Sequence, residues 1–263
     1  MTTLVKIEHL MKVYGHSKSD KVAVLKDVSF SFEQGEIIGL IGASGAGKST
    51  IGKILAGLET PTKGTIHFGD TELTSLKTKA RRQFAKHISM IFQDPYESLS
   101  PRMKIYELVE EPLLIQQLEP NKEKRKELVK EALKVVSLDP DKYMHRYPHE
   151  LSGGERQRVG VARAFVCKPK LIIADEPTSM LDTSLRLELI QLLKEMNVQY
   201  DISYVFVTHD IALTKGFCDR IIVLHEGEIV DEGATEKVIE QPTHPFTQSL
   251  INALLLLEGH GGI

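Results

Sequence analysis

The chain has 263 residues, of which 41% are hydrophobic and 26% are charged, and its formal net charge at pH 7 is −3. This composition is typical of a folded globular protein, and the length suffices for one large domain or two small ones. The slightly acidic balance argues against a chain whose main activity is to grip nucleic acid through its phosphates. The two cysteines lack metal-ligand spacing, and no stretch reaches the roughly 18 apolar residues of a spanning helix, so work at a membrane would require a separate anchor.

The N-terminal third contains short strands and one helix. Apolar residues alternate in the first two segments, which predicts half-exposed strands of antiparallel β structure. A third, apolar segment runs directly into a glycine-rich loop, and residues 47–58 predict the helix that follows this loop. The predicted strands of this part are 4–9, 24–32, 36–41, 65–68 and 88–92.

From about Met103 to Lys168 the pattern is helical, which predicts an all-helical insert. Strands separated by helices then return, and this alternation predicts a parallel α/β core. The clearest helices of the insert are 107–117, 122–137 and 155–167. After the insert, the predicted strands are 171–174, 203–207 and 220–224, and the predicted helices are 184–196 and a shorter one after Asp210.

A phosphate-binding loop lies between the strand at 36–41 and the helix that follows it. Residues 42–49 read GASGAGKS and fit the pattern GxxxxGK[ST]. In such a loop the backbone amides turn inward as an anion nest, while Lys48 reaches the β- and γ-phosphates and the Ser49 hydroxyl ligates Mg²⁺. The residues predicted to contact the nucleotide here are Gly42, Ser44, Gly45, Ala46, Gly47, Lys48, Ser49 and Thr50.

Carboxylate, amide and imidazole side chains follow other predicted strands. The strand at 171–174 ends in Asp175, which is expected to hold Mg²⁺ through water, and in Glu176, which is expected to polarise the attacking water as a general base. Gln93 can contact both the metal and that water without adding charge. His209 can donate a hydrogen bond to the γ-phosphate and so sense its presence. Together with Lys48, these residues predict a site for triphosphate hydrolysis.

The run LSGGE at residues 151–155 predicts a second anion site. Ser152, Gly153 and Gly154 precede the helix that begins near Glu155, so a hydroxyl and backbone amides stand at a positive helix end. One chain then carries two phosphate-binding surfaces for one nucleotide. The economical arrangement is a head-to-tail pair of protomers, each of which completes the other's site.

With these motifs the chain resembles the ATP-binding cassette (ABC) ATPases over essentially its whole length. The motifs appear in order as Walker A at 42–49, Q-loop at Gln93, signature at 151–155, Walker B at 171–175 with Glu176, D-loop at 179–182 and switch His209. The resemblance implies catalytic roles for Glu176, His209, Gln93 and Lys48 and metal ligands at Ser49, Gln93 and Asp175. It also implies nucleotide contacts by Tyr14, which matches the aromatic that stacks on adenine, and by the run from Ser152 to Glu155 and Asp182. Met180 stands where the family usually has alanine, so an altered contact across the dimer is expected.

The resemblance also implies the fold. It is a P-loop NTPase fold of α/β class, with a RecA-like parallel-sheet core, an N-terminal antiparallel β subdomain and an inserted helical subdomain. Residues 1–263 would form a single ABC ATPase domain, with the helical subdomain at about 96–168 and a short C-terminal extension at about 241–263.

Two segments narrow the resemblance to the oligopeptide, dipeptide and nickel importer ATPases. They are QDPYESLSPRM at 93–103 and HPFTQSL at 244–250, in which Ser100 replaces the usual asparagine and Phe246 the usual tyrosine. In that group the segment after the Q-loop helps to receive the coupling helix of a membrane permease. Some relatives carry a cysteine cluster for iron and sulfur near the C-terminus, which two scattered cysteines exclude here.

The function expected from this resemblance is ATP hydrolysis that powers a multi-chain importer. The expected cofactors are ATP and Mg²⁺, and the cargo is peptides, with nickel complexes as the alternative. The expected partners are two transmembrane permeases, a second ATPase chain that is identical or a sister, and indirectly an extracytoplasmic binding protein; no nucleic acid is expected. The chain would lie peripherally at the cytoplasmic face of the membrane. A different class, soluble cassettes that act on ribosomes or nucleic acid, usually has two cassettes or long coiled-coil insertions, and this chain has one cassette and no sustained heptads.

Overall fold

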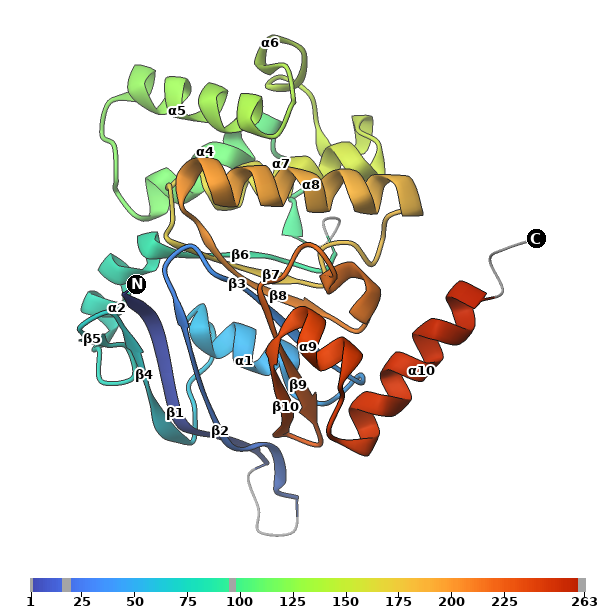
Figure 1. Ribbon diagram of the computed structural model, residues 1–263. Coiled ribbons are helices and arrows are strands. Elements are labelled where there is room, and N and C mark those ends of the chain that lie inside the picture. Colours follow the sequence, from blue (N-terminus) through green and yellow to red (C-terminus); the bar gives the residue numbers. More distant parts are fainter. Residues whose placement is uncertain (1, 16–19, 95–97, 260–263) are drawn as a thin grey trace. The chain divides into compact units, whose positions relative to one another are not determined.

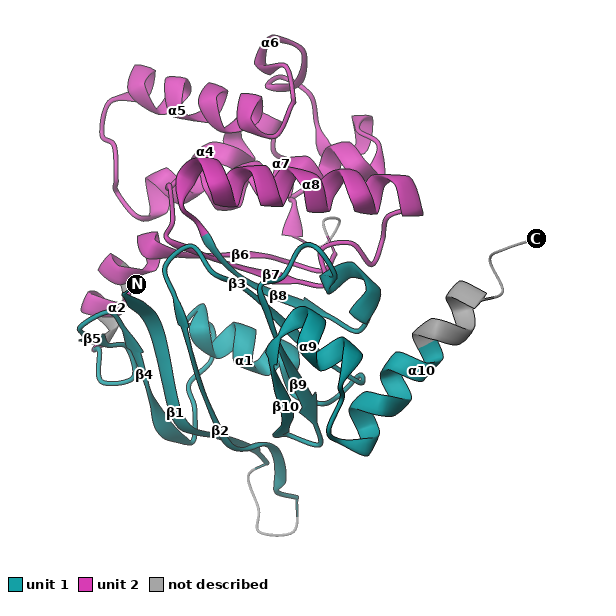
Figure 2. Cartoon of the chain, in the orientation of Figure 1, with its two compact units in different colours: residues 1–76, 203–263 teal, residues 77–202 magenta. Residues whose placement is uncertain are grey.

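The computed structural model describes residues 2–15, 20–94 and 98–259. The chain divides into two compact units, coloured separately in Figure 2. Unit 1 comprises Met1–Leu76 and Ser203–Ile263, and unit 2 comprises Lys77–Ile202. The site residues predicted above are therefore divided between the two units.

Unit 1 contains an antiparallel sheet built from the N-terminal part of the chain (Figure 1). Its strand order is β2-β1-β4-β5, and β1 pairs antiparallel with both β2 and β4. Apolar side chains of β2 such as Leu25, Val28 and Phe30 are buried, while Asp27 and Ser29 between them are exposed, as the alternating pattern predicted. The strands are β1 (Thr3–Tyr14), β2 (Val22–Glu33), β4 (Lys63–Phe68) and β5 (Thr71–Glu72).

The second group of strands in unit 1 has the order β10-β9-β3-β8. Strand β3 pairs parallel with both β8 and β9, whereas β10 pairs antiparallel with β9. Every residue of β3 and β8 is buried, which explains their continuous apolar runs. The strands are β3 (Ile37–Gly42), β8 (Ser203–Thr208), β9 (Arg220–His225) and β10 (Glu228–Ala234), and the last of them was not predicted.

Helix α1 (Lys48–Leu55) follows the phosphate-binding loop and ends three residues earlier than predicted. Gly57 has φ +73°, a left-handed conformation that glycine adopts at low cost. The Gly57 amide donates to the Ile54 carbonyl and the Leu58 amide to the Lys53 carbonyl, the pattern of a Schellman cap. The helix therefore stops before the break that the sequence placed at residues 60–64.

The remaining helices of unit 1 are short, with one exception. The 3₁₀ helix η3 (Ile211–Thr214) is the predicted short helix after Asp210. Helices α9 (Thr235–Glu240) and α10 (Pro245–Gly259) were not predicted, and α10 lies within residues 241–263, the segment expected to be a C-terminal extension. In Figure 1, the β9–β10 hairpin is followed by α9 and then by α10.

Unit 2 holds two paired strands and most of the helices. Strands β6 (Ile88–Ile91) and β7 (Leu171–Asp175) pair in parallel, and α4, α5 and α7 pack on one another around residues such as Val109, Leu133 and Val159. The longer helices are α4 (Ile105–Ile115), α5 (Lys122–Val135), α7 (Gly153–Phe165) and α8 (Thr183–Tyr200). The short ones are α2 (Thr78–Phe84), η1 (Ala85–His87), α6 (Pro140–Tyr143) and η2 (Pro148–Glu150).

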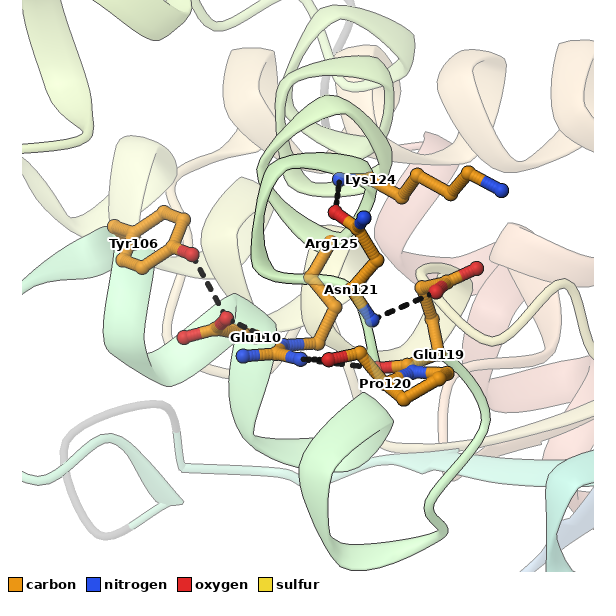
Figure 3. Close-up of polar contacts among 7 residues, drawn as sticks. All are labelled: Tyr106, Glu110, Glu119, Pro120, Asn121, Lys124 and Arg125. Atoms are coloured by element: carbon orange, nitrogen blue, oxygen red, sulfur yellow. Dashed lines mark hydrogen bonds and ion pairs between the residues drawn. The ribbon is translucent and has the colours of Figure 1, made fainter.

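An ion pair between buried Glu110 and half-buried Arg125 fixes the corner between α4 and α5 (Figure 3). The Glu110 carboxylate lies 2.7 Å from Arg125 Nε and accepts a hydrogen bond from the Tyr106 hydroxyl. The Arg125 guanidinium also donates to the carbonyls of Glu119 and Pro120 in the connecting loop. Burial, together with the Glu110 carboxylate, raises the pKa of Tyr106 to about 12, so the hydroxyl keeps its proton and donates.

Among the residues that the structure describes, no helix is both long enough and apolar enough to cross a membrane.

Candidate nucleotide site

The phosphate-binding loop of unit 1 is shaped by close approach of its glycines to neighbouring strands. A Cβ added at Gly42 would lie 2.2 Å from the Leu224 carbonyl oxygen, which belongs to β9. A Cβ added at Gly47 would lie 2.6 Å from Leu25 Cδ2 and 2.9 Å from the Val24 carbonyl oxygen of β2. Only glycine fits at these two positions, so the sequence pattern follows from the packing of the loop against β2 and β9.

Lys48 is the first residue of α1 and is 5% exposed. Its ammonium donates to the carbonyl oxygens of Gly42 and Ala43, at 2.8 and 2.9 Å. The charge thus lies within the loop, close to the first-turn amides of α1, where a helix N-terminus also favours anions. Ala46 and Gly47 are buried, whereas Ser44 and Gly45 are exposed and Ser49 and Thr50 are half-buried.

These features fit the phosphates of a nucleotide. The glycine positions leave no room for a Cβ beneath the loop, while Gly45 on its outer side has no atom within 4 Å of a Cβ. The loop therefore presents backbone and a buried ammonium where a side chain would block an anion. The contact of each predicted residue with nucleotide remains a prediction.

Tyr14 ends β1, and its hydroxyl donates to the Glu59 carboxylate. The Lys12 ammonium lies 3.3 Å from Glu59 Oε2 and 4.7 Å from the centre of the Tyr14 ring. Burial and the Glu59 carboxylate raise the pKa of Tyr14. Tyr14 is therefore held by Glu59 and Lys12, two residues that the sequence analysis missed because nothing local in the sequence links them to residue 14.

His209 directly follows β8 and is exposed. Residue Thr208 of β8 pairs with Ile41 of β3, so the parallel register brings the carboxyl ends of both strands to one edge of the sheet. The phosphate-binding loop begins at that edge, and unit 1 thus assembles Lys48 and His209 on one side, as open parallel sheets do at ligand sites. Asp210 accepts a hydrogen bond from the Ala212 amide at 3.0 Å and so begins η3.

Unit 2 brings the other predicted catalytic groups together. Strands β6 and β7 run parallel with Ile91 opposite Ala174, so Gln93 and Glu176 both follow the carboxyl end of the pair. Gln93 Nε2 donates to Glu176 Oε2 at 3.3 Å. Asp175, the last residue of β7, is buried. Glu176 has φ +44°, a backbone conformation that is unusual for a residue other than glycine. The backbone therefore leaves the extended conformation of β7 directly after Asp175.

The signature run begins helix α7 through a capping box. Ser152 Oγ accepts from the Glu155 amide, and the Glu155 carboxylate accepts from the Ser152 amide at 2.8 Å and from the Tyr143 hydroxyl at 2.5 Å. These hydrogen bonds, led by that of Tyr143, hold the pKa of Glu155 below its ordinary value. Since a serine hydroxyl both accepts and donates, Ser152 keeps a proton to offer to an anion. Glu155 itself is engaged in the cap, and its predicted nucleotide contact stays a prediction.

The second glycine of the signature is packed and the first is open. A Cβ at Gly154 would lie 3.1 Å from Leu185 Cδ2 of α8, whereas a Cβ at Gly153 would meet no atom within 4 Å. Sequence reasoning missed Tyr143 and Arg156, whose guanidinium donates to the Leu151 carbonyl at 2.7 Å. Both residues hold the corner that presents these first-turn amides.

The D-loop contains one exposed apolar residue and one capping carboxylate. Met180 is 57% exposed, and Asp182 Oδ1 accepts from the Leu185 amide at 3.0 Å as the N-cap of α8. Backbone hydrogen bonding by Leu185 lowers the pKa of Asp182. The predicted nucleotide contact of Asp182 and the predicted dimer contact of Met180 remain predictions.

The donor set predicted for Mg²⁺ consists of oxygen groups in both units. Ser49 follows the loop lysine of unit 1, and Asp175 and Gln93 end strands of unit 2. Hydroxyl, carboxylate and amide oxygens are ligands that suit Mg²⁺, which usually takes few protein ligands and otherwise binds phosphate and water. In the described ranges there is no cluster of three or more His, Cys, Asp or Glu side chains that could hold a metal by itself.

The segment after Gln93 is tied to α7. Residues 95–97, part of the segment expected to receive a permease, lie outside the described residues. Ser98, just after them, accepts a hydrogen bond through its carbonyl from Arg163 of α7 at 2.8 Å, and Arg163 also pairs with Glu111 of α4. The chain that follows Gln93 is thus joined to α7, the helix that Ser152 caps.

Comparison with known proteins places these motifs in a family. A family model described as ABC transporter matches residues 25–179. The oligopeptide transport ATP-binding protein OppF of Streptococcus mutans serotype c is 41% identical over 251 residues, which are 95% of this chain and 81% of that protein.

Solved structures are similar over most of the chain. The dimeric, post-hydrolysis structure of the ATP-binding cassette MJ0796 bound to ADP and Pi has a TM-score of 0.79 at 33% identity and covers 88% of this chain and 98% of that one. CbiO1 from Clostridium perfringens, part of the ABC transporter complex cbiONQ, has a TM-score of 0.81 at 27% identity, with coverages of 99% and 98%. These neighbours agree with the predicted P-loop fold of ABC cassettes. The family model matches more than half of the chain, and the identity with OppF extends over 95% of it. This chain therefore belongs to the ABC transporter family.

Proposed function

We propose that this chain is the ATP-hydrolysing subunit of a membrane importer for oligopeptides or dipeptides. The observation that carries the enzymatic part is the hydrogen bond from Gln93 to Glu176, since it joins the predicted water-positioning amide to the predicted base beside buried Asp175. Residues 1–263 form a single ABC ATPase domain, in which about 96–168 are the inserted helical subdomain and about 241–263 a C-terminal extension.

The residues of the site divide the work of hydrolysis. Lys48 and the backbone amides of the loop bind the phosphates, and Tyr14 stacks on the adenine. Gln93 orients a water molecule, Glu176 accepts its proton as it attacks the γ-phosphate, and His209 donates a hydrogen bond to that phosphate. Ser49, Gln93 and Asp175 would hold Mg²⁺, which would neutralise part of the phosphate charge.

A second ATPase chain completes the site in a head-to-tail dimer. Ser152, Gly153 and Gly154 of one chain face the γ-phosphate held by the loop of the other, and Asp182 and Met180 lie at that junction. The similar cassette MJ0796, whose structure bound to ADP and Pi is dimeric, supports the pairing of two ATPase chains. ATP must bind the closed pair more tightly than the open pair, because only such a difference can drive closure.

The dimer drives two transmembrane permeases from the cytoplasmic face of the membrane, to which the chain is attached peripherally through them. The segment after Gln93 receives a coupling helix of the permease, and an extracytoplasmic binding protein delivers the cargo. The two segments QDPYESLSPRM and HPFTQSL support the importer group. Within that group, the identity to an oligopeptide transport protein favours peptides over nickel complexes.

The enzymatic proposal is tested by Glu176→Gln. Because the base is lost and the shape of the side chain is kept, turnover is expected to fall by about 10² to 10⁴ while ATP still binds. Glu195→Gln is the matched control, since Glu195 is an exposed carboxylate of α8 that bonds only Gln191 among the contacts described. Near-normal turnover in Glu176→Gln would remove Glu176 from this role.

The transport proposal is tested by trapping. Glu176→Gln is expressed in host membranes, held with ATP, purified gently, and its bound proteins are identified. Two permeases and an identical or sister ATPase are expected. Copurification of ribosomes or nucleic acid without membrane proteins would refute the importer.

A further inference from the structure

The HPF residues 244–246 of the C-terminal extension join the start of α10 to β10, and the proposed function gives these contacts no role. The Asp231 carboxylate of β10 accepts from the His244 amide at 2.9 Å, from the Thr243 amide at 3.3 Å and from the Thr243 hydroxyl. His244 Nδ1 accepts from the Phe246 amide at 3.1 Å, so the imidazole caps the first turn of α10. Asp231, Thr243, His244, Phe246 and His225 are called the C-terminal clasp below.

The hydrogen bonds of the clasp favour an ionised carboxylate. Burial raises the pKa of Asp231, but hydrogen bonds from Thr243 and His244 more than offset this effect, and the pKa lies below its ordinary value. Charge-assisted hydrogen bonds of this kind are stronger than neutral ones. The start of α10 is therefore firmly fixed to β10.

The clasp reaches the phosphate-binding loop through one residue of β9. The ring of His225 stacks on the ring of Phe246, with centroids 4.0 Å apart and planes at 24°. His225 directly follows Leu224, whose carbonyl oxygen lies 2.2 Å from the position of a Cβ on Gly42. The backbone beneath the loop and the start of α10 are therefore joined by two adjacent residues.

The clasp also supports the segment that carries His209. Helix α10, whose Thr247 and Ile251 are buried, packs against η3, which begins two residues after His209. η3 also approaches β3, because Thr214 Cγ2 lies 3.3 Å from the position of a Cβ added at Gly39. The switch segment thus contacts both the strand that leads to the phosphate-binding loop and the helix that the clasp anchors.

We propose that the C-terminal clasp is a positioning device for hydrolysis, which holds η3, and through it His209, in register with the phosphate-binding loop. The inference rests on the proposed function and deepens it, because it gives the HPF residues a part in the ATPase step. Asp231, His244 and Phe246 touch no nucleotide and act through His209. Loss of the clasp is therefore expected to slow hydrolysis more than it weakens ATP binding.

The first experiment is steady-state ATP hydrolysis by the purified full-length chain carrying Asp231→Ala and His244→Ala together. We expect kcat to fall about tenfold, since displacing a catalytic group by about an ångström lowers the rate by about one to two orders of magnitude. The KM for ATP is expected to stay within about twofold of the wild type, because Lys48 and the loop remain. Asn252→Ala, an exposed change on α10 outside the clasp, is the matched control and is expected to leave both constants unchanged.

The second experiment repeats the clasp variant in a His209→Ala background under single-turnover conditions. If the clasp acts through His209, removing it after His209 is gone causes no further loss of rate. An equal further loss in this background, an unchanged kcat, or a rise of KM alone would overturn the proposal. Should the double variant not fold, Phe246→Leu, which removes only the ring stacked on His225, is put through the same comparison.

The two proposals fail separately. A wild-type chain that hydrolyses ATP, and that loses turnover with Glu176→Gln, supports the proposed function whatever the clasp variants do. Full turnover of the clasp variants in that setting overturns the clasp alone, and absence of ATP hydrolysis by the wild type overturns both.

Discussion

Substitution of Gly47 by alanine tests how the phosphate-binding loop is held. Gly47 has φ +104°, and the new Cβ would lie 2.6 Å from Leu25 Cδ2 and 2.9 Å from the Val24 carbonyl oxygen. Gly45 also has a positive φ of +81°, but a Cβ there would meet no atom within 4 Å. The two variants therefore share the backbone penalty and differ in the steric one.

The expected magnitudes follow from these distances. Alanine in the left-handed region costs about 1–2 kcal/mol at either position. Crowding in a packed site costs about 1–3 kcal/mol more, and it applies only at Gly47, where one of the clashing atoms is backbone and cannot swing away. We expect Gly45→Ala to lower the free energy of unfolding by about 1–2 kcal/mol and Gly47→Ala by about 2–5 kcal/mol.

The assay is urea unfolding of both variants without nucleotide, with free energies compared only where the slopes on denaturant agree. Equal slopes show that the same surface is exposed in each case, which matters for a chain with two compact units. Equal losses of stability in Gly45→Ala and Gly47→Ala would refute the argument that contact with β2 excludes a side chain at Gly47.

Three further predictions concern charged groups. Lys48→Ala removes the buried ammonium of the loop. The Kd for ATP is expected to rise about 10- to 100-fold, because one or two charge-assisted hydrogen bonds are lost. Unchanged affinity in an equilibrium binding measurement contradicts this. Glu155→Gln is expected to lower the free energy of unfolding at neutral pH. Because the pKa of Glu155 in the folded chain lies below its ordinary value of 4.5, the stability difference from wild type should disappear as the pH falls through that folded pKa. A stability difference that persists in acid contradicts the role of the charge. Arg125→Ala leaves Glu110, whose side chain is 10% exposed, without its cation and should lower the free energy of unfolding in urea by about 3 kcal/mol. Lys130→Ala, which breaks an exposed ion pair, should lower it by less than about 1 kcal/mol. Equal losses in the two variants would count against burial as the cause.

Elements whose environment is uniform along their length could be predicted from local patterns alone. Strands β3 and β8 are buried on both faces, so their apolar runs were readable, and the polar residues that end strands marked the site. The glycine-rich loop was readable because its conformation demands glycine at fixed positions. Residues Gln93 and Glu176 were predicted to act together, and the structure joins them by a hydrogen bond.

The distant residues that support those motifs were visible only in the folded chain. Strand β10 is half-exposed at the end of its sheet and shows little periodicity, so its place depends on pairing with β9. The contacts of Tyr143 with Glu155 and of Asp231 with His244 join elements that come together only on folding. A local pattern records burial and backbone conformation at each position, whereas a partner across the fold leaves no period or spacing in the sequence, and for that reason these supports could be found only in three dimensions.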